Sequence, residues 1–463
     1  MNVKKKLVNG ISYLITMDEE RRIIKDAAIE IEGKSITAVG KEKDFDENEY
    51  SLVIDAGGMV CLPGLINAHF HPMQQLARGL ADNLLSPTWL HDRIFPFEGE
   101  MEAEDVYWSY MLAILELIKT GTTCFADPGG YYMEQGVAAI KKLGIRSVVS
   151  RSIIDIHSSS RPLPESFKES TEEAVAKGEE FVKRYHGDAD GRIKGSFSLR
   201  SDRAISSKAC RMVAELAEKY KVSIQSHLSS HIDGVKRHKE IFDGMRPIER
   251  FAKLGLLNKY LIASHMNKMT DEEVELIRKN DVKIVHNPSA GFAGAYGTLL
   301  GKHPEMVKKG VTVALGSDAA PISHFNDMFR VMNMLGGHRD VREDPSLFPP
   351  ETILEMCLIN GAKALLWDNE IGSIECRKKA DFILLDTHQL EFMPLHNPLS
   401  NIVYAINGNS VDTVMINGEL VMKGRKLLTY DEEEIILNAN KASKRLAQKS
   451  GLDKVAVPKW PVI

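Results

Sequence analysis

The chain has 463 residues, of which 43% are hydrophobic and 27% are charged, and its formal net charge is -5. This composition is typical of a folded globular protein, and the near-neutral balance argues against a nucleic-acid coat or a membrane-surface binder. Five widely spaced cysteines without a CxxC pair fit a reducing compartment and no disulfide framework. With no convincing secretory signal and no apolar window of about 20 residues, we expect a cytoplasmic protein.

The two ends of the chain share a β-rich pattern. Residues 1–57 contain short apolar runs broken by glycine or charges, and similar runs recur at 380–386 and 412–422. Asn417-Gly418 lies between two apolar runs and predicts a hairpin. We therefore predict a small β-sandwich formed by residues 1–57 and 370–430, with two unrelated caps as the alternative. A helical tail is expected over 431–463.

The middle of the chain, residues 58–369, alternates short apolar runs with amphipathic helical patterns such as those at 104–121, 210–220 and 271–280. Eight runs are predicted to be strands: 59–71, 120–128, 146–155, 192–199, 222–228, 261–266, 282–288 and 311–318. Eight buried strands that alternate with helices predict an α/β fold, the (β/α)8 TIM barrel. The segment from residue 76 to about 101 is too long for a simple loop, and we expect it to cover the barrel mouth.

Polar residues stand at the ends of four of these predicted strands. The first ends in His69-Phe70-His71, the fifth in His227, the sixth in His265 and the eighth in Asp318. Active sites of such barrels are assembled at the carboxyl ends of the strands, and residues two apart on a strand share a face. Imidazole and carboxylate are ligands for zinc or iron. The four strand ends therefore predict a metal site.

A chemical mechanism follows from this set. A divalent metal with an open position lowers the pKa of bound water towards about 7, and Asp318 is placed to take a proton from that water. His265 can then orient the nucleophile or stabilise charge on the attacked carbon. Near the seventh strand, Asn287 is the better candidate for the pocket, with His286 as a packing residue, because neighbours on a strand face opposite sides. His91, His231 and His324 lie on predicted loops.

The motifs PGLINAHFH, ARGLADN, PTWLHDRIFP, GTTCFAD, SHLSSH, ASHMN, VHNPSAG and VALGSDAA resemble the amidohydrolase superfamily. The resemblance is strongest to its branch of cytosine, S-adenosylhomocysteine and guanine deaminases and triazine hydrolases. YHGDADGRI and the C-terminal block are especially similar to atrazine chlorohydrolase and melamine deaminase. The likeness covers essentially the whole chain and supports both the barrel and the composite β-sandwich.

The resemblance implies metal ligands at His69, His71, His227 and Asp318, with His265 as the catalytic histidine and Asp318 as ligand and proton shuttle. The fourth strand ends in Ser198-Leu199 without the lysine that would bridge two metals. It thus implies one divalent ion per chain, zinc by default with iron as the alternative. A homodimer or larger homo-oligomer is also implied.

One position departs from the deaminases of this branch. There a glutamate follows the fifth-strand histidine by three residues and protonates the ring nitrogen beside the attacked carbon, whereas here that residue is Ser230. His231 or another loop residue could replace it, or the substrate could need no ring protonation.

We therefore expect an amidohydrolase that acts on C–N bonds other than peptide bonds, of the cyclic amidine deaminase type. Its substrate would be an N-heteroaromatic purine, pyrimidine, pterin or aminotriazine. The alternative is hydrolysis of another C–X bond, such as a triazine substituent, C–Cl or an amide-like or guanidine-like C–N bond. A non-catalytic scaffold is disfavoured because every ligand is intact.

The substrate pocket is expected to be formed by Gln74, Trp89, Ser230, Asn287 and Phe292. Trp89 could stack on a flat heterocycle or simply pack in the segment over the mouth. Two arginines after or within the predicted barrel strands, Arg151 and Arg200, could bind an anionic substituent or form surface ion pairs. We expect a small-molecule substrate and neither a nucleic-acid nor a membrane partner.

Overall fold

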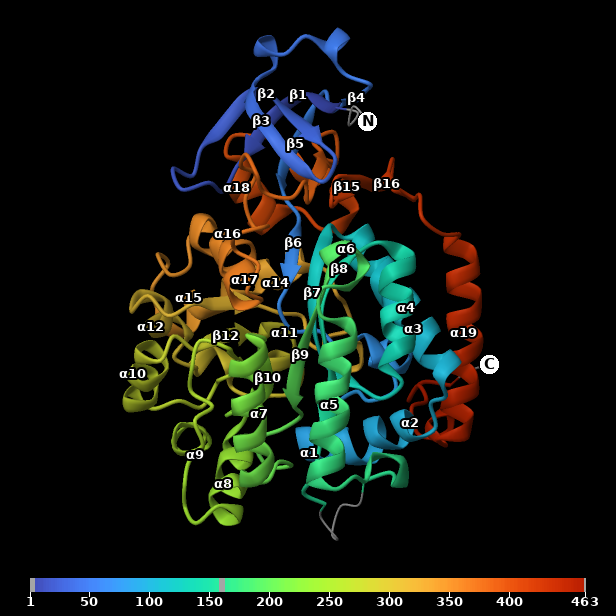
Figure 1. Cartoon of the computed structure of the whole chain (residues 1–463), viewed down its shortest axis with the longest axis vertical. Helices are drawn as coiled ribbons and strands as arrows, with labels where there is room; N and C mark the ends of the chain where they lie inside the picture. Colours follow the sequence, from blue (N-terminus) through green and yellow to red (C-terminus); the bar gives the residue numbers. More distant parts are fainter. Residues whose placement is uncertain (1–4, 158–162, 462–463) are drawn as a thin grey trace.

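The computed structural model describes residues 5–157 and 163–461. Two sheets organise them: an eight-stranded parallel barrel and a nine-stranded mixed sheet that lies above it in Figure 1. The (β/α)8 barrel and the β-rich unit built from both termini, both predicted from the sequence, are confirmed.

The terminal sheet joins the two ends of the chain along one hydrogen-bonded path. β5 pairs antiparallel with β14, so the N-terminal and C-terminal strands meet at the middle of the path. In the predicted hairpin, Asn417 and Gly418 have φ values of 55° and 79°, as a tight two-residue turn requires. The strands are β1 (Lys5–Ile15), β2 (Ile23–Glu32), β3 (Ser35–Lys41), β4 (Leu52–Asp55), β5 (Met59–Pro63), β14 (Phe382–Asp386), β15 (Val411–Ile416), β16 (Glu419–Lys423) and β17 (Lys426–Leu427).

The barrel strands follow one another in chain order and are all parallel. Each predicted run gives a strand of this barrel. The strands are β6 (Leu65–Asn67), β7 (Thr122–Gly130), β8 (Arg146–Ile153), β9 (Ile193–Leu199), β10 (Ile224–Leu228), β11 (Leu261–His265), β12 (Lys283–His286) and β13 (Val313–Leu315). The first and last strands are joined by hydrogen bonds from Ala68 N to Leu315 O at 2.9 Å and from Asp318 N to His69 O at 2.9 Å.

The run at 59–71 was predicted to be one barrel strand, and this is wrong. The chain divides it into β5 of the terminal sheet and β6 of the barrel, with Gly64 between them. A Cβ at Gly64 would stand 2.1 Å from Thr123 Oγ1, so only glycine lets the chain pass β7 here. The sequence does not reveal this change of sheet, because β5 and β6 are both buried and form one continuous apolar run.

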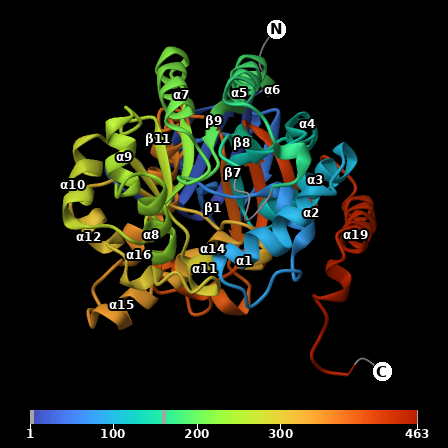
Figure 2. The same cartoon turned by 90° about the horizontal axis from the view of Figure 1, so that it is seen from below.

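Helices surround the barrel, as the view along it in Figure 2 shows. Their ends carry side-chain caps: Ser170 and Glu173 form a capping box at the start of α5, and Thr270 and Glu273 do so at α10. The helices are α1 (Ser86–Trp89), α2 (Phe95–Gly99), α3 (Ala103–Lys119), α4 (Met133–Leu143), α5 (Thr171–Tyr185), α6 (Asp188–Gly191), α7 (Ser207–Tyr220), α8 (Ile232–Ile241), α9 (Pro247–Lys253), α10 (Asp271–Lys279), α11 (Pro288–Ala293), α12 (His303–Lys308), α13 (Ala320–Ser323), α14 (Met328–Met334), α15 (Gly337–Arg342), α16 (Pro350–Cys357), α17 (Ile359–Ala364), α18 (Pro398–Ser400) and α19 (Glu432–Lys449).

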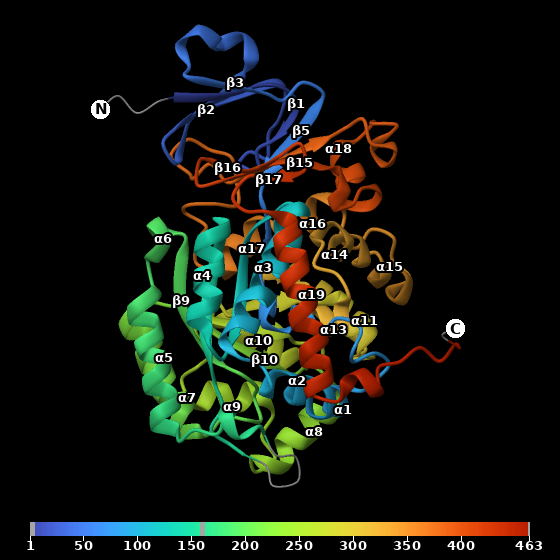
Figure 3. The ribbon, with the colours of Figure 1, turned by 90° about the vertical axis from the view of Figure 1, so that its right-hand side faces the viewer.

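The predicted C-terminal helix is α19, which packs against α3 on the outside of the barrel (Figure 3). Lys119 Nζ pairs with the Glu432 carboxylate at 2.9 Å near one end of the contact. Near the other end, Ser443 Oγ donates to Leu76 O at 2.8 Å. The helix thus fastens the beginning of the segment at the barrel mouth.

A buried ion pair fastens the terminal sheet to the barrel. Arg146, at the start of β8, donates through Nε and Nη2 to the two oxygens of Asp381 at 2.8 and 3.0 Å, and both side chains are 1% exposed. Asn417 N, in the hairpin turn, donates to the same carboxylate at 2.7 Å. Asp381 therefore connects a barrel strand with the C-terminal hairpin.

Replacing Asp381 by alanine should destabilise the fold strongly, because it leaves the Arg146 guanidinium buried without a counter-charge. We expect the free energy of unfolding to fall by about 3–5 kcal/mol, measured by urea denaturation. Glu172→Ala, which breaks an exposed pair with Lys208 whose side chains are both 60% exposed, is the control and should change stability little. Equal effects of the two substitutions would contradict this role.

Candidate metal centre

Four histidines and one aspartate meet at the carboxyl ends of the barrel strands. His69 and His71 follow β6, and Phe70 between them is buried on the opposite side, against Phe125. Phe70 forms a β-bridge with Asp318, so the closure of the barrel brings the carboxylate to the two imidazoles.

The distances separate the cluster into two parts that share Asp318. His71 Nε2 lies 3.2 Å from His227 Nε2, and one nitrogen each of His69, His71 and His227 can face a common ion. Asp318 Oδ1 lies 3.7 Å from His69 Nε2 and 3.5 Å from His71 Nε2. Its other oxygen, Oδ2, lies 3.7 Å from His265 Nε2. One carboxylate oxygen therefore faces the histidine triad and the other faces His265.

Burial sets the charge state of this cluster. It holds the pKa of His69, His71 and His265 well below the usual value and lowers that of His227 to about 4, so the rings are neutral and offer lone pairs. Burial also raises the pKa of Asp318 to about 7. A cation among these groups would favour the carboxylate form of Asp318.

The hydrogen bonds at the outer edge of the rings direct the remaining nitrogens inward. His227 Nδ1 donates to Arg200 O at 2.6 Å, which leaves the lone pair on Nε2. His69 Nδ1 lies 2.9 Å from Ser264 Oγ, and its Nε2 is buried with no hydrogen-bond partner among the described residues. An orphaned buried nitrogen that faces a carboxylate fits a metal ligand, so the donor set suits a divalent ion such as zinc.

The predicted pocket residues lie in different surroundings. Gln74 is buried, and its Nε2 donates to Glu98 Oε1 at 2.6 Å. Asn287 Nδ2 lies 3.4 Å from His265 Nδ1. Trp89 is buried and its Nε1 reaches Pro321 O at 3.5 Å, in the segment that follows Asp318. Phe292 is 39% exposed.

Ser230, where the deaminases of the resembled branch have glutamate, forms a pair with the next residue. Ser230 Oγ lies 2.9 Å from His231 Nδ1. The His231 ring stacks on Tyr296 with centroids 5.6 Å apart, and Tyr296 in turn meets the edge of His265 at 6.0 Å. The pair therefore lies one aromatic ring away from His265.

Arg200 was considered for a surface ion pair, but its ion pair is buried, and its partner Glu98 was missed by sequence reasoning. Arg200 Nη2 pairs with Glu98 Oε1 at 3.1 Å, and Glu98 also accepts the bond from Gln74. Since the Arg200 carbonyl accepts from His227, this pair supports a ring of the triad. Glu98 lies in α2, in the segment over the mouth, and no sequence pattern marks it. Arg151 pairs instead with Glu169 at 2.6 Å.

The remaining histidines that the sequence singled out lie elsewhere. His286 joins a second group of buried rings with His303 and His338. His324 is 47% exposed and lies 3.5 Å from Asp82. His91 meets Phe95 edge to face at 5.2 Å.

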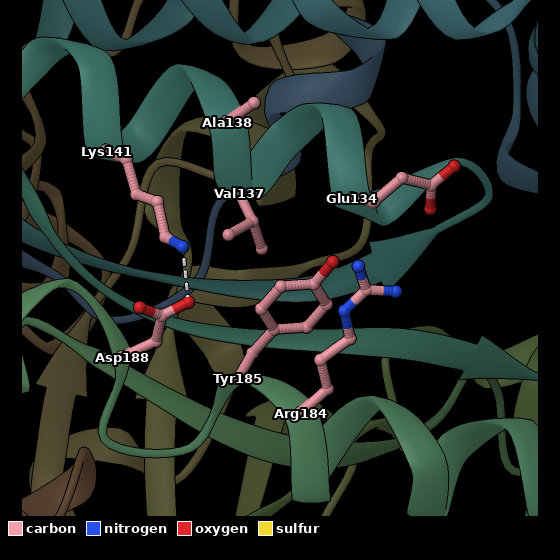
Figure 4. A pocket seen from close by; sticks show the side chains of 7 residues that line it. All are labelled: Glu134, Val137, Ala138, Lys141, Arg184, Tyr185 and Asp188. Carbon is pink, nitrogen blue, oxygen red and sulfur yellow. Dashed lines mark ion pairs between the residues drawn. The ribbon is translucent and has the colours of Figure 1, made fainter.

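A surface pocket lies between α4 and α5 (Figure 4). It is lined by Glu134, Val137, Ala138, Lys141, Arg184, Tyr185 and Asp188, with an ion pair between Lys141 and Asp188 at 2.5 Å. None of the candidate site residues lines it, so it is separate from the histidine cluster.

Comparison with known proteins shows the family to which the chain belongs. Residues 60–421 match the Amidohydrolase family. The chain belongs to the amidohydrolase family. The resemblance seen in the sequence is confirmed, and the chain is a hydrolase that acts on C–N bonds other than peptide bonds.

Relatives from two organisms match nearly end to end. The 5-methylthioadenosine/S-adenosylhomocysteine deaminase of Thermoanaerobacter pseudethanolicus is 34% identical over 439 residues, 94% of this chain and 98% of the relative. The 5'-deoxyadenosine deaminase of Methanobrevibacter smithii is 34% identical over 94% of this chain and 100% of its own length. A zinc-bound adenosine deaminase from Xanthomonas campestris superposes with a TM-score of 0.89 at 27% identity, over 96% and 98% of the two chains.

Two general expectations can be judged here. The family and a histidine cluster that could hold an ion both support a bound divalent metal. Across residues 5–157 and 163–461, no helix combines the length and apolar character needed to cross a bilayer.

Removing a ligand should remove the metal. We expect His71→Ala and His227→Ala to lower the affinity for zinc at least about tenfold, since each deletes one of a small number of ligand bonds. Plasma mass spectrometry after dialysis against a zinc buffer measures the metal content. His324→Ala, at the exposed histidine, is the control and should keep the wild-type content. Full metal content in both ligand variants would contradict the assignment.

Proposed function

We propose that this chain deaminates an N-heteroaromatic ring by hydrolysis, and that its substrate is an adenosine-type nucleoside modified at the 5' position. The observation that carries this is the division of Asp318 between the histidine triad and His265. Relatives named for 5-methylthioadenosine, S-adenosylhomocysteine and 5'-deoxyadenosine, each 34% identical over 94% of this chain, support the substrate class.

The ligands in this proposal are His69, His71, His227 and Asp318 Oδ1, around one zinc ion per chain. When bound, the ion lowers the pKa of water towards about 7. Support for zinc over iron comes from the zinc-bound Xanthomonas structure.

The reaction then needs one proton to move twice. Asp318 accepts a proton from the attacking water, and His265 donates a hydrogen bond to the oxygen as the C–O bond forms. Asp318 next delivers this proton to the amino group. The C–N bond breaks and ammonia leaves, so water and amine account for every atom of the products.

Ser230 and His231 are proposed to bind the ring nitrogen beside the attacked carbon. Burial lowers the pKa of His231 to about 4, so the ring is uncharged at neutral pH. In the tautomer with the hydrogen on Nδ1, His231 donates a hydrogen bond to Ser230 Oγ. The hydroxyl can then donate to the ring nitrogen. This unit supplies a hydrogen bond rather than a carboxylic proton.

The remaining pocket roles are also proposals. Gln74 and Asn287 would provide amide groups at the pocket wall, Trp89 a flat apolar surface, and Phe292 a contact at the rim. The homo-oligomeric state, the cytoplasmic location and the domain bounds of 1–57 with 370–430, 58–369 and 431–463 stay predictions.

A second function is favoured by one observation, the serine at position 230. Without a carboxylic acid there, the site could instead hydrolyse a C–X bond whose leaving group needs no protonation, such as C–Cl on a triazine. Such a substrate would release chloride rather than ammonia, which separates the two functions directly.

Ammonia release tests the main proposal. The zinc-loaded protein should release ammonia from 5'-methylthioadenosine, S-adenosylhomocysteine and 5'-deoxyadenosine, and more slowly from cytosine, a pterin and an aminotriazine. His265→Ala should lower kcat by about 10²- to 10⁴-fold, since it removes a hydrogen-bonding group at the reacting oxygen. Absence of ammonia with metal bound would overturn deamination, and chloride from a chlorotriazine would establish the alternative.

Substitutions at the Ser230–His231 pair test its role. We expect Ser230→Ala and His231→Phe each to lower kcat/KM for the best amine substrate by about 10- to 100-fold, as for the loss of one hydrogen bond in the transition state. Ser230→Glu should retain ammonia release, because it restores the carboxyl group of the resembled deaminases. Ser346→Ala, at an exposed loop serine, is the control. An unchanged rate in Ser230→Ala would remove Ser230 from the mechanism.

A further inference from the structure

A second group of histidines lies directly behind the metal centre. His286 ends β12, His303 begins α12 and His338 lies in the first turn of α15, and all three side chains are 0% exposed. The helices α12 and α15 lie on the same side of the barrel in Figure 1. The function proposed above uses none of these rings.

The rings are arranged as a stack rather than as a second metal site. His286 and His303 lie face to face, with centroids 3.8 Å apart and planes 24° apart. No carboxylate belongs to the group, so the charge of an ion would be uncompensated.

One bond leads from this stack to the catalytic histidine. His303 Nε2 lies 2.8 Å from the carbonyl oxygen of His265. A carbonyl only accepts, so Nε2 of His303 carries the hydrogen and donates it. Burial lowers the pKa of His303 to about 4, and the ring therefore stays neutral while it makes this bond.

The backbone that receives this bond is strained. His265 and Met266 have φ values of 76° and 54°, so two successive residues with side chains occupy the left-handed region. Such a backbone conformation is unfavourable for a residue with a side chain and persists only where the surrounding structure holds it. This turn ends β11 and sets the direction in which the His265 ring leaves the strand.

The His303 ring is itself held in place. It stacks on His286, whose Nε2 lies 3.1 Å from His338 Nε2. The residue after His286 is Asn287, which reaches the His265 ring at 3.4 Å. The end of β12 thus supports His265 twice, at its carbonyl through His303 and at its ring through Asn287.

We propose that His303 is a positioning residue for the deamination, which fixes the left-handed turn at His265 and thereby aims the His265 ring at the reacting oxygen. His286 and His338 hold the His303 ring in its orientation. This inference rests on the proposed function and assigns a role to a buried histidine outside the metal centre.

Three variants test it. His303→Phe keeps a ring against His286 and removes the donor, whereas His303→Gln keeps an N–H donor. His238→Phe is the matched control, because His238 is equally buried and its Nδ1 bonds a backbone carbonyl, that of Met245, at 3.0 Å. Ammonia release, zinc content and thermal midpoint are measured for all three.

We expect His303→Phe to lower kcat by about 10- to 100-fold, because small misplacements of a catalytic group have effects of this size. KM and zinc content should stay within about twofold of wild type, His303→Gln should recover most of kcat, and His238→Phe should keep it. A kcat unchanged in His303→Phe would overturn the proposal. So would equal losses in all three variants that follow their thermal midpoints, since these would show a general effect of stability.

A crystallographic comparison separates this inference from the proposed function. In zinc-loaded His303→Phe the His265–Met266 turn should differ from wild type, whether or not any substrate is turned over. If the wild-type protein releases no ammonia, the deaminase proposal fails while this comparison still decides the structural part. An identical turn in both proteins would overturn the positioning role.

Discussion

The closure of the barrel is the constraint on which the site depends. β6 and β13 are only three residues long, and the contacts that join the first and last strands continue beyond them, through Ala68, His69 and Asp318. The hydrogen bond from Asp318 N to His69 O is at once a closing bond of the barrel and the contact that brings the carboxylate to the histidine cluster. Fold and chemistry therefore share the same backbone atoms.

This arrangement explains why the cluster can be so polar and still be buried. Burial favours neutral imidazole, which is the form that binds a metal, and it also favours a protonated aspartate, which is the form that has just taken a proton. The outer nitrogen of His69 meets Ser264 on β11, and that of His227 donates to the carbonyl of Arg200 just after the neighbouring strand β9. Their inner nitrogens are therefore directed without a change of conformation. The site is preorganised because the rings are attached to three barrel strands, with His69 and His71 after β6, His227 in β10 and His265 in β11.

The sequence predicted those parts of the molecule that follow from local patterns. Alternating apolar runs predicted the eight barrel strands, and the polar residue at four strand ends pointed to the histidines and aspartate that meet in the structure. It did not predict the division of 59–71 between two sheets, because both parts are equally apolar. Nor did it mark Glu98 or His303, whose roles come from distant contacts with Arg200 and with the His265 carbonyl.

A serine at position 230 does not prevent deamination, but it makes the rate depend more on the other groups of the site. Hydrolytic deamination consumes no external proton, since the proton lost by water can be the one that leaves with ammonia. A glutamate at this position makes the ring a better electrophile by protonating it, whereas a serine can only donate a hydrogen bond. To reach the same rate, Asp318 must activate the attacking water more effectively and His265 must stabilise the reacting oxygen more strongly. An enzyme with a weaker acid at the ring gains most from an accurately placed base and histidine, which gives a physical reason for the second layer of buried histidines behind His265.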